Sequence, residues 1–413
     1  MLGLVLTAGG ARGAYQAGVL KRIGEIPSLR NQPSPFRVIA GASAGAINGS
    51  VLAALSGNLN EATVLLARVW ERLTVRDVFR PDLLSFVTNG MRLLADLGLG
   101  GLVGGGRVQS LLDTAPLRGF LERTLPLDGI AEAINRGHLY ALAVTATSYH
   151  SGRSFTFIQG RAGHPVWLKR RRVTLPVEIT LDHVCASAAI PIVFAPVRLM
   201  CEGRPLWFGD GGLRLVNPFS PAIRLGATRV LAVGIRSQGA AASLSRAEQL
   251  AGAESESTTH RPPLAQICGV FLNAIFLDHL DADLDHLERM NELITAYGGD
   301  ATEPATARGM KEPMRVVRPF VVSPSQDLAI VAKELSYRMP GVVRYLLDGL
   351  GTPDAQSADL MSYLLFDNAY TRALVDIGYY DAGARIDEIE AFLRGEEPYG
   401  EMPEPVQAVS GMR

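Results

Sequence analysis

Three glycine-rich segments, each directly after a short apolar run, constrain the fold of this chain more than any other feature. They are Gly9–Gly13 (GGARG), Gly41–Gly45 (GASAG) and Gly209–Gly212 (GDGG). The apolar runs have the length of buried strands, and helical patterns follow the first two segments. The predicted strands and helices are Leu2–Thr7, Ala14–Ile23, Phe36–Ala40, a helix ending near Leu55, and Leu206–Phe208. This alternation predicts an α/β fold with a mainly parallel central sheet, whose strand ends bring the three segments together.

The composition is that of a globular protein. Of the 413 residues, 47% are hydrophobic and 20% charged, which excludes a disordered or fibrous chain. Lys and Arg number 40 and Asp and Glu 41, a net charge of -1. No overall positive field would attract nucleic acid, so we expect no nucleic-acid partner.

The segment Gly41–Gly45 fits the pattern G-x-S-x-G with Ser43 at its centre. The pattern is typical of a sharp strand-to-helix turn that exposes a serine hydroxyl, because the glycines let strand and helix pass closely. The helix N-terminus adds positive potential where an oxyanion would form. The sequence therefore makes Ser43 a candidate nucleophile, and a plain strand–helix turn is the alternative.

The segment Gly9–Gly13 has neither the G-x-G-x-x-G spacing of dinucleotide sites nor the Lys-Ser/Thr ending of a P-loop. Successive glycines can instead direct backbone N–H groups at one anion. In a serine hydrolase that anion is the oxygen of the tetrahedral intermediate. Arg12 would hold the loop in shape or add positive potential. The alternative is a tight turn between a strand and a helix.

Asp210 lies between glycines at the end of a predicted strand. On its own this pattern is typical of a β-turn, which Asp-Gly pairs favour. Together, the three segments could supply a nucleophile, a carboxylate base and an oxyanion hole.

Together the three segments resemble the patatin-like phospholipase family, which combines a Gly-Gly-X-Arg/Lys-Gly loop, a G-x-S-x-G elbow and an Asp-Gly-Gly/Ala motif in this order. The stretch Cys185–Pro196 is also similar to the family's segment before the Asp motif. The resemblance covers about the first 235 residues. It implies a three-layer α/β/α core with a mainly parallel sheet, to which this chain adds a mostly helical C-terminal extension.

The resemblance also implies a mechanism: a lipid acyl hydrolase with a Ser–Asp dyad and no histidine. Ser43 would attack the ester carbonyl, and Asp210 would take its proton. We expect no metal and no cofactor. The residues that the resemblance implies for the oxyanion hole are Gly9, Gly10, Ala11, Arg12 and Gly13; those for the elbow are Gly41 and Gly45; those for the Asp motif are Gly211 and Gly212.

The positions of the histidines indicate whether a Ser-His-Asp triad is an alternative to the dyad. In the order Ser, Asp, His the third member would be His260, His279 or His286. His260 lies in a presumed loop, and the other two lie seven residues apart in an acidic helical pattern, so solvated helix histidines are expected. The aspartates between them suggest a metal site as an alternative, but a charged solvated face is favoured.

The predicted organisation has four parts. Residues 1–236 form the catalytic core, with a variable cap or lid at 82–106; 237–263 form a flexible loop; 264–397 form a helical part packed on the core; 398–413 form a disordered tail. Within the third part we predict helices at Leu264–Tyr297, Asp327–Leu350 and Asp359–Ile377, and a strand at Val316–Val322.

The expected substrate is a lipid ester of the phospholipid or lysophospholipid type. An acyltransferase on the same dyad and a non-catalytic lipid-binding protein are the alternatives. The apolar stretch Leu83–Val103 is either a lid or a helix packed on the sheet, and the basic run Lys169–Arg172 is either a contact with anionic headgroups or a solvated loop. We find no signal peptide or transmembrane pattern and expect a cytoplasmic protein, with peripheral membrane contact left open.

Overall fold

The computed structural model describes residues 1–80, 110, 112–237, 278–297, 314–339, 341 and 358–396. These residues form one ten-stranded sheet. Its strands are β1 (Leu2–Leu6), β2 (Val38–Ala42), β3 (Ala141–Ser148), β4 (Ser154–Gly160), β5 (Leu168–Lys169), β6 (Arg172–Pro176), β7 (Val197–Cys201), β8 (Arg204–Gly209), β9 (Arg229–Val233) and β10 (Arg318–Val322).

The centre of the sheet is parallel. Strands run in the order β10-β9-β1-β2-β3, and every neighbouring pair in that series is parallel. Strand β4 pairs antiparallel with β3, and so does β8, which brings the end of β8 beside the parallel strands. The expectation of a mainly parallel α/β sheet is confirmed, and the C-terminal part supplies the edge strand β10.

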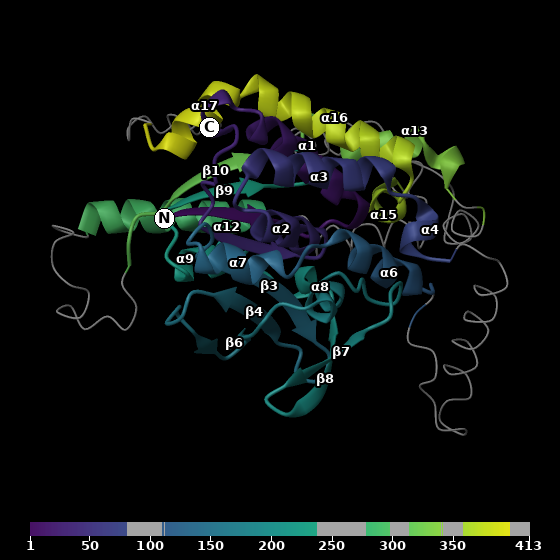
Figure 1. The fold of residues 1–413 in the computed structure, drawn as a ribbon, viewed down its shortest axis with the longest axis horizontal. Helices are drawn as coiled ribbons and strands as arrows, with labels where there is room; N and C mark the ends of the chain where they lie inside the picture. The colour runs from purple at the N-terminus through teal and green to yellow at the C-terminus, as the bar shows by residue number, and fades with distance from the viewer. Residues whose placement is uncertain are drawn as a thin grey trace, which may run out of the picture.

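Helices cover both faces of the sheet (Figure 1). They are α1 (Gly13–Gly24), α2 (Ala44–Ala54), α3 (Leu59–Arg72), α4 (Val75–Val78), α6 (Ala115–Thr124), α7 (Gly129–Asn135), α8 (Leu181–Ser187), α9 (Ser220–Arg224), α12 (Asp278–Tyr297), α13 (Leu328–Glu334), α15 (Ala358–Leu364), α16 (Asn368–Ala384) and α17 (Ile386–Arg394). Short 3-10 helices are η1 (Gly10–Arg12), η2 (Pro27–Leu29), η3 (Gly211–Leu213) and η5 (Ser336–Arg338). None of the described helices is long and apolar enough to cross a membrane.

Alternate residues of the parallel strands belong to two separate cores, as the two-residue period of a strand requires. Leu4 and Ile39 join the larger core, with α1, α2, α3, α15 and α16. Val5 and Val38 join the smaller core on the opposite face, with α9 and α12. This division gives the three-layer α/β/α arrangement.

On the larger face, α16 lies across α1 and α3 (Figure 1). Glycines allow the helices α1 and α16 to approach closely. A Cβ at Gly18 would overlap the carbonyl of Val375, and one at Gly378 would overlap the carbonyl of Tyr15. The C-terminal helices therefore pack on the N-terminal ones through backbone contact.

Two predicted helices were wrong in extent. The pattern Asp359–Ile377 was predicted as one helix, but it breaks into α15 and α16 because the side chain of Asp367 accepts a hydrogen bond from the Ala369 N–H at 2.9 Å and caps a new helix. The helix predicted at Asp327–Leu350 is interrupted, because α13 ends at Glu334 and Met339 is extended (φ -66°, ψ 139°). Residues 340 and 342–350 of this prediction lie outside the described residues. Pro340 follows Met339, and a residue before proline avoids the helical conformation.

Several predictions lie outside the described residues: the cap at 82–106, the loop at 237–263 beyond Ser237, the tail at 398–413 and the first part of Leu264–Tyr297. The basic run Lys169–Arg172 joins β5 to β6. Arg172 donates to the Ser220 hydroxyl at 3.0 Å, and the other three residues of the run are exposed. Their contact with a membrane stays a prediction.

Candidate active site

Ser43 occupies the sharp turn between β2 and α2. It has φ 55° and ψ -127°, a left-handed conformation that a non-glycine residue adopts only when its surroundings enforce it. The flanking glycines do so, because a Cβ at Gly41 would overlap the Gly45 carbonyl and one at Gly45 would overlap the Leu6 carbonyl. The Ser43 residue is only 2% exposed. A sharp strand-to-helix turn with a strained serine is therefore present at Ser43.

A second serine, Ser187 in α8, is hydrogen-bonded to the backbone of this turn. The backbone N–H of Ser43 donates to the Ser187 hydroxyl at 3.0 Å, and that hydroxyl donates to the Thr145 carbonyl of β3 at 2.6 Å. Sequence analysis gave Ser187 no role, although it lies in Cys185–Pro196, the stretch that carried part of the family resemblance. Ser187 thus ties the elbow to the neighbouring parallel strand.

Asp210 lies just beyond the end of β8 and is fully buried. Its backbone N–H donates to the Ala189 carbonyl, its carbonyl accepts from the Thr147 hydroxyl, and its Oδ1 accepts from the Gly212 N–H, all at 2.8 Å. A Cβ at Gly211 would overlap the carbonyl of Thr145. The glycines of the Asp motif therefore allow this backbone to pack directly against β3.

Complete burial raises the pKa of Asp210 from 3.8 to about 7, against the lowering effect of hydrogen bonding from Ser43 and from the Gly212 N–H. The Ser43 side chain is thus near enough to act on the carboxylate. No fully formed hydrogen bond joins the two side chains, however, and Oδ2 of Asp210 has no hydrogen-bond partner among the described residues. The structure brings Ser43 and Asp210 close together, and Oδ2 of Asp210 accepts no hydrogen bond from the described residues.

The loop Gly9–Gly13 lies beside the elbow. A Cβ at Gly13 would come within 2.5 Å of the Ala44 Cβ, on the residue after Ser43. Gly10 has φ 54°, which glycine adopts without strain. Within the loop, the Arg12 N–H donates to the Gly9 carbonyl at 3.1 Å, and the Gly13 N–H points at the carbonyls of Gly10 and Ala11.

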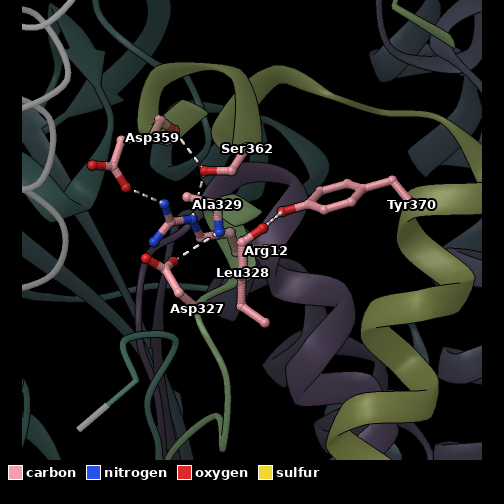
Figure 2. Close-up of polar contacts among 7 residues, drawn as sticks. All are labelled: Arg12, Asp327, Leu328, Ala329, Asp359, Ser362 and Tyr370. Carbon is pink, nitrogen blue, oxygen red and sulfur yellow. Dashed lines mark hydrogen bonds and ion pairs between the residues drawn. The ribbon is translucent and has the colours of Figure 1, made fainter. Parts of the chain in front are cut away.

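The side chain of Arg12 reaches α15, in the C-terminal part of the chain (Figure 2). Its Nε donates to the Ser362 hydroxyl at 2.7 Å, its Nη2 meets Asp359 Oδ1 at 2.9 Å, and its guanidinium lies 4.5 Å from the Tyr363 ring centroid. Burial works against the charge of Arg12, but nearby tyrosines and aspartates outweigh it and raise the Arg12 pKa. Sequence analysis missed these three partners, since they follow Arg12 by about 350 residues.

An apolar pocket opens over Ser43 and Gly10. Its free volume is only about 40 Å³, close to the space of one water molecule. The apolar side chains that line it come from the N-terminal helices, from the region of α8 and from the C-terminal part: Ile47, Val69, Trp70, Leu73, Val78, Leu117, Phe120, Leu121, Ile190, Phe194 and Phe366. The rings of Phe194 and Phe366 are 6.4 Å apart, so the C-terminal part supplies one wall.

Buried amides brace the helices beneath the pocket. Trp70 Nε1 donates to Asn48 Oδ1 at 2.8 Å, and Asn48 donates to the Gly13 carbonyl at 3.0 Å and to Gln16 Oε1 at 2.9 Å. Gln16 in turn donates to the Thr7 carbonyl at 2.9 Å. This chain of satisfied hydrogen bonds links the oxyanion loop, the elbow helix and a pocket wall.

The described histidines do not complete a triad. His279 and His286 lie on α12, whose buried leucines belong to the core on the face opposite α2. His183 caps α8 through its Nδ1, and burial lowers its pKa to about 4. His260 lies outside the described residues. No group of three metal-binding side chains occurs within the described ranges.

The fold and the site define an α/β protein with a strained serine at the carboxyl edge of a mainly parallel sheet, next to a buried aspartate. The family model for patatin-like phospholipase matches residues 4–223, which is 220 of the 413 residues. The chain belongs to this family, whose members are lipid hydrolases. A search of curated proteins by sequence gave no match.

Solved structures similar to this chain include VipD from Legionella pneumophila and the human GIVD cytosolic phospholipase A2. VipD is 14% identical with a TM-score of 0.32, and the match covers 94% of this chain and 66% of VipD. The human enzyme, in complex with a fluorophosphonate inhibitor, is 14% identical with a TM-score of 0.39, over 96% of this chain and 60% of its own. The chain thus spans less than two thirds of each of these proteins' lengths.

Proposed function

We propose that this protein is a serine lipid acyl hydrolase, of the phospholipase A or lysophospholipase type, that cleaves carboxylic esters through a Ser43–Asp210 dyad and an acyl-enzyme. The observation that carries the proposal is the pairing of a strained serine with a buried aspartate whose Oδ2 has no hydrogen-bond partner within the described part of the chain. A buried unsatisfied carboxylate oxygen costs stability, and such a cost is typical of a functional site.

The proposed reaction has two halves. Asp210 removes the proton of Ser43 Oγ as that oxygen attacks the ester carbonyl, and returns it to the leaving alcohol when the tetrahedral intermediate collapses to the acyl-enzyme. Asp210 then takes a proton from water as that water attacks the acyl carbonyl, and returns it to Ser43 Oγ when the bond between Oγ and the acyl carbon breaks and the fatty acid is released. A pKa of about 7 suits both steps, because the carboxyl group can accept and return protons near neutral pH.

Within the predicted oxyanion hole we propose Gly10 and Ala11 as the donors. The N–H groups of Arg12 and Gly13 already point at carbonyls of the same loop. Gly10 lies in the pocket with Ser43, where a developing oxyanion would be stabilised by backbone N–H groups. Ala11 follows it in η1.

The apolar pocket is the proposed acyl site. Its lining suits a hydrocarbon chain, but a free volume of about 40 Å³ holds no fatty acyl group. Side chains of the pocket must therefore move when substrate enters, and the aromatic pair Phe194 and Phe366 is one wall that can separate.

Substitution of the dyad tests the proposal. Ser43→Ala and Asp210→Asn should each lower p-nitrophenyl ester hydrolysis by about 10⁴-fold or more, by analogy with loss of an activated nucleophile. Ser50→Ala is the matched control, because the buried Ser50 hydroxyl only donates to the Ala46 carbonyl of its own helix. Full activity of Ser43→Ala, or fluorophosphonate labelling that persists in it, would refute the dyad.

An acyltransferase is the second candidate. Burial of Ser43 in an apolar pocket limits access of water to the acyl-enzyme, which favours an alcohol acceptor. Product formation that depends on added glycerol or lysolipid would identify transfer. Absence of both hydrolysis and labelling would leave the non-catalytic lipid-binding alternative.

A further inference from the structure

We propose that α15 positions the oxyanion loop, with Arg12 as the positioning residue held by Asp359, Ser362 and Tyr363. The inference rests on the proposed acyl hydrolase function and extends it. It assigns a task in the reaction to a part of the chain that carries none of the three motifs.

The guanidinium of Arg12 makes its side-chain contacts with residues of α15. Nε and Nη2 each have a partner within 3 Å (Figure 2). The Tyr363 ring lies against the guanidinium, with its centroid 4.5 Å away. Arginine forms such forked contacts in a fixed plane, so they set the orientation of the side chain as well as its position. Arg12 is 2% exposed and does not line the pocket, so it acts on the reaction through the loop.

The backbone of the loop also rests on α15. A Cβ at Gly10 would overlap the carbonyl oxygen of Tyr363, so these two backbones are in contact. Gly10 is the residue that shares the pocket with Ser43. A shift of α15 would therefore be transmitted to the proposed oxyanion donors both through Arg12 and directly.

A hydrogen bond within α15 orients the Ser362 hydroxyl for its contact with Arg12. The Ser362 hydroxyl donates to the Asp359 carbonyl at 2.5 Å, which turns its lone pairs towards Nε of Arg12 (Figure 2). Phe366, just after α15, lines the same pocket. One short segment thus positions the loop and supplies a wall of the acyl site.

Neighbouring helices fix α15 in place. It packs against α13, and Tyr370 at the start of α16 donates to the Leu328 carbonyl of α13 at 3.1 Å. Asp327 caps α13 by accepting from the Ala329 N–H at 2.9 Å (Figure 2). The support of the oxyanion loop therefore extends over the C-terminal helices.

The test compares Ser362→Ala and Asp359→Asn with wild type in the full chain. Ser362→Ala removes one hydrogen-bond partner of Arg12, and Asp359→Asn removes the negative charge of the other. We expect kcat for p-nitrophenyl esters to fall about tenfold or more in each variant while KM stays nearly constant, because the donors act on the transition state. Affinity for an alkyl trifluoromethyl ketone, which forms a tetrahedral adduct with Ser43, should fall by a similar factor. Arg12→Lys keeps the charge but cannot bind both partners, so its kcat should lie between those of wild type and Arg12→Ala.

Two controls separate positioning from general destabilisation. Ser50→Ala removes a buried hydroxyl elsewhere, and Glu132→Gln removes the acid of the exposed Arg136–Glu132 ion pair; both should keep wild-type kcat. Each variant is assayed well below its Tm. Wild-type kcat and ketone affinity in both Ser362→Ala and Asp359→Asn would overturn the inference. If Ser43→Ala is inactive in the same assay, the proposed function survives that outcome; if it is active, the function fails first.

Discussion

The proposed nucleophile elbow and the proposed oxyanion loop are both glycine turns after parallel strands, yet they are held in different ways. The elbow is fixed mainly by main-chain contacts, where Gly41 and Gly45 pass against carbonyls of the elbow and of β1, and the Ser187 hydroxyl adds one hydrogen bond. The loop is fixed mainly by α15, through the partners of the Arg12 side chain and through the contact of the Gly10 backbone with the Tyr363 carbonyl. One turn depends on its local sequence, and the other depends on packing between the two ends of the chain.

This difference indicates which substitutions the elbow and the loop each tolerate. Main-chain contacts have no side chain that can adjust, so any added Cβ in the elbow forces strand and helix apart. A loop held by side chains can lose one contact and keep its fold with altered geometry. Elbow variants should therefore lose the fold and the activity together, and loop variants should lose mainly the activity.

The largest expected effect is that of Gly45→Ala. The new Cβ would overlap the Leu6 carbonyl, so we expect loss of ester hydrolysis and a loss of stability of about 1–3 kcal/mol or more, measured by chemical unfolding. Gly49→Ala, one turn along α2, is the control, since its Cβ would come no closer than 3.1 Å to a side-chain methyl of Ile39. Equal stability of the two variants would contradict the main-chain account of the elbow.

Gly10→Ala should have the next largest effect. Its Cβ would overlap the Tyr363 carbonyl, and its φ of 54° adds about 1 kcal/mol of strain. We expect kcat to fall about tenfold to a hundredfold, and stability to fall more than in the control because the Tyr363 carbonyl must move. Gly137→Ala has the same kind of strain (φ 75°) with no atom within 4 Å, and it should keep wild-type kcat. An unchanged kcat in Gly10→Ala would show that contact with α15 does not matter to the loop.

The smallest expected effect is on the pH dependence of kcat/KM, which separates the role of Asp210 from that of the loop. Because Asp210 must be ionised to act as a base, kcat/KM should rise about tenfold per pH unit below its pKa of about 7 and level off above it. Arg12 is not among the groups that set this pKa, so Ser362→Ala should lower the profile without moving its midpoint. A shifted midpoint in that variant would mean that α15 acts on the base as well as on the loop.

The same pKa has a consequence for stability. Its rise on folding means that the folded state keeps a proton on Asp210 between about pH 4 and pH 7, where the unfolded chain has lost it. Stability should therefore fall as pH rises through this range, by up to about 4 kcal/mol. Asp210→Asn should remove this dependence, as pH-dependent unfolding would show.

The sequence predicted those parts of the site whose geometry comes from local patterns. Strand, glycine turn and helix follow one another at Ser43. The glycines in the sequence mark the positions where backbone segments pack too closely to leave room for a Cβ. For Arg12 the sequence left two roles open, and the hydrogen bonds of its side chain to α15 are the reason why we propose that it holds the loop in shape.

Contacts between distant segments were beyond sequence reasoning. Nothing in the pattern around Asp359 and Ser362 distinguishes a buried partner of Arg12 from an ordinary helix residue, because the contact exists only when both ends of the chain fold together. The break between α15 and α16 was missed because the apolar pattern continues across it. Asp367, a residue type that commonly caps helices, was the available signal.

Trp70 gives the apolar pocket a natural optical reporter. Its indole is buried, faces the pocket and is hydrogen-bonded to Asn48, which sits one turn from the start of the elbow helix. The chain has three tryptophans, and of these only Trp70 lines this pocket, so substitution of Trp167 and Trp207 would isolate its signal. Entry of an acyl chain, or distortion of the elbow beneath it, would then be visible as a change in emission wavelength without any added label.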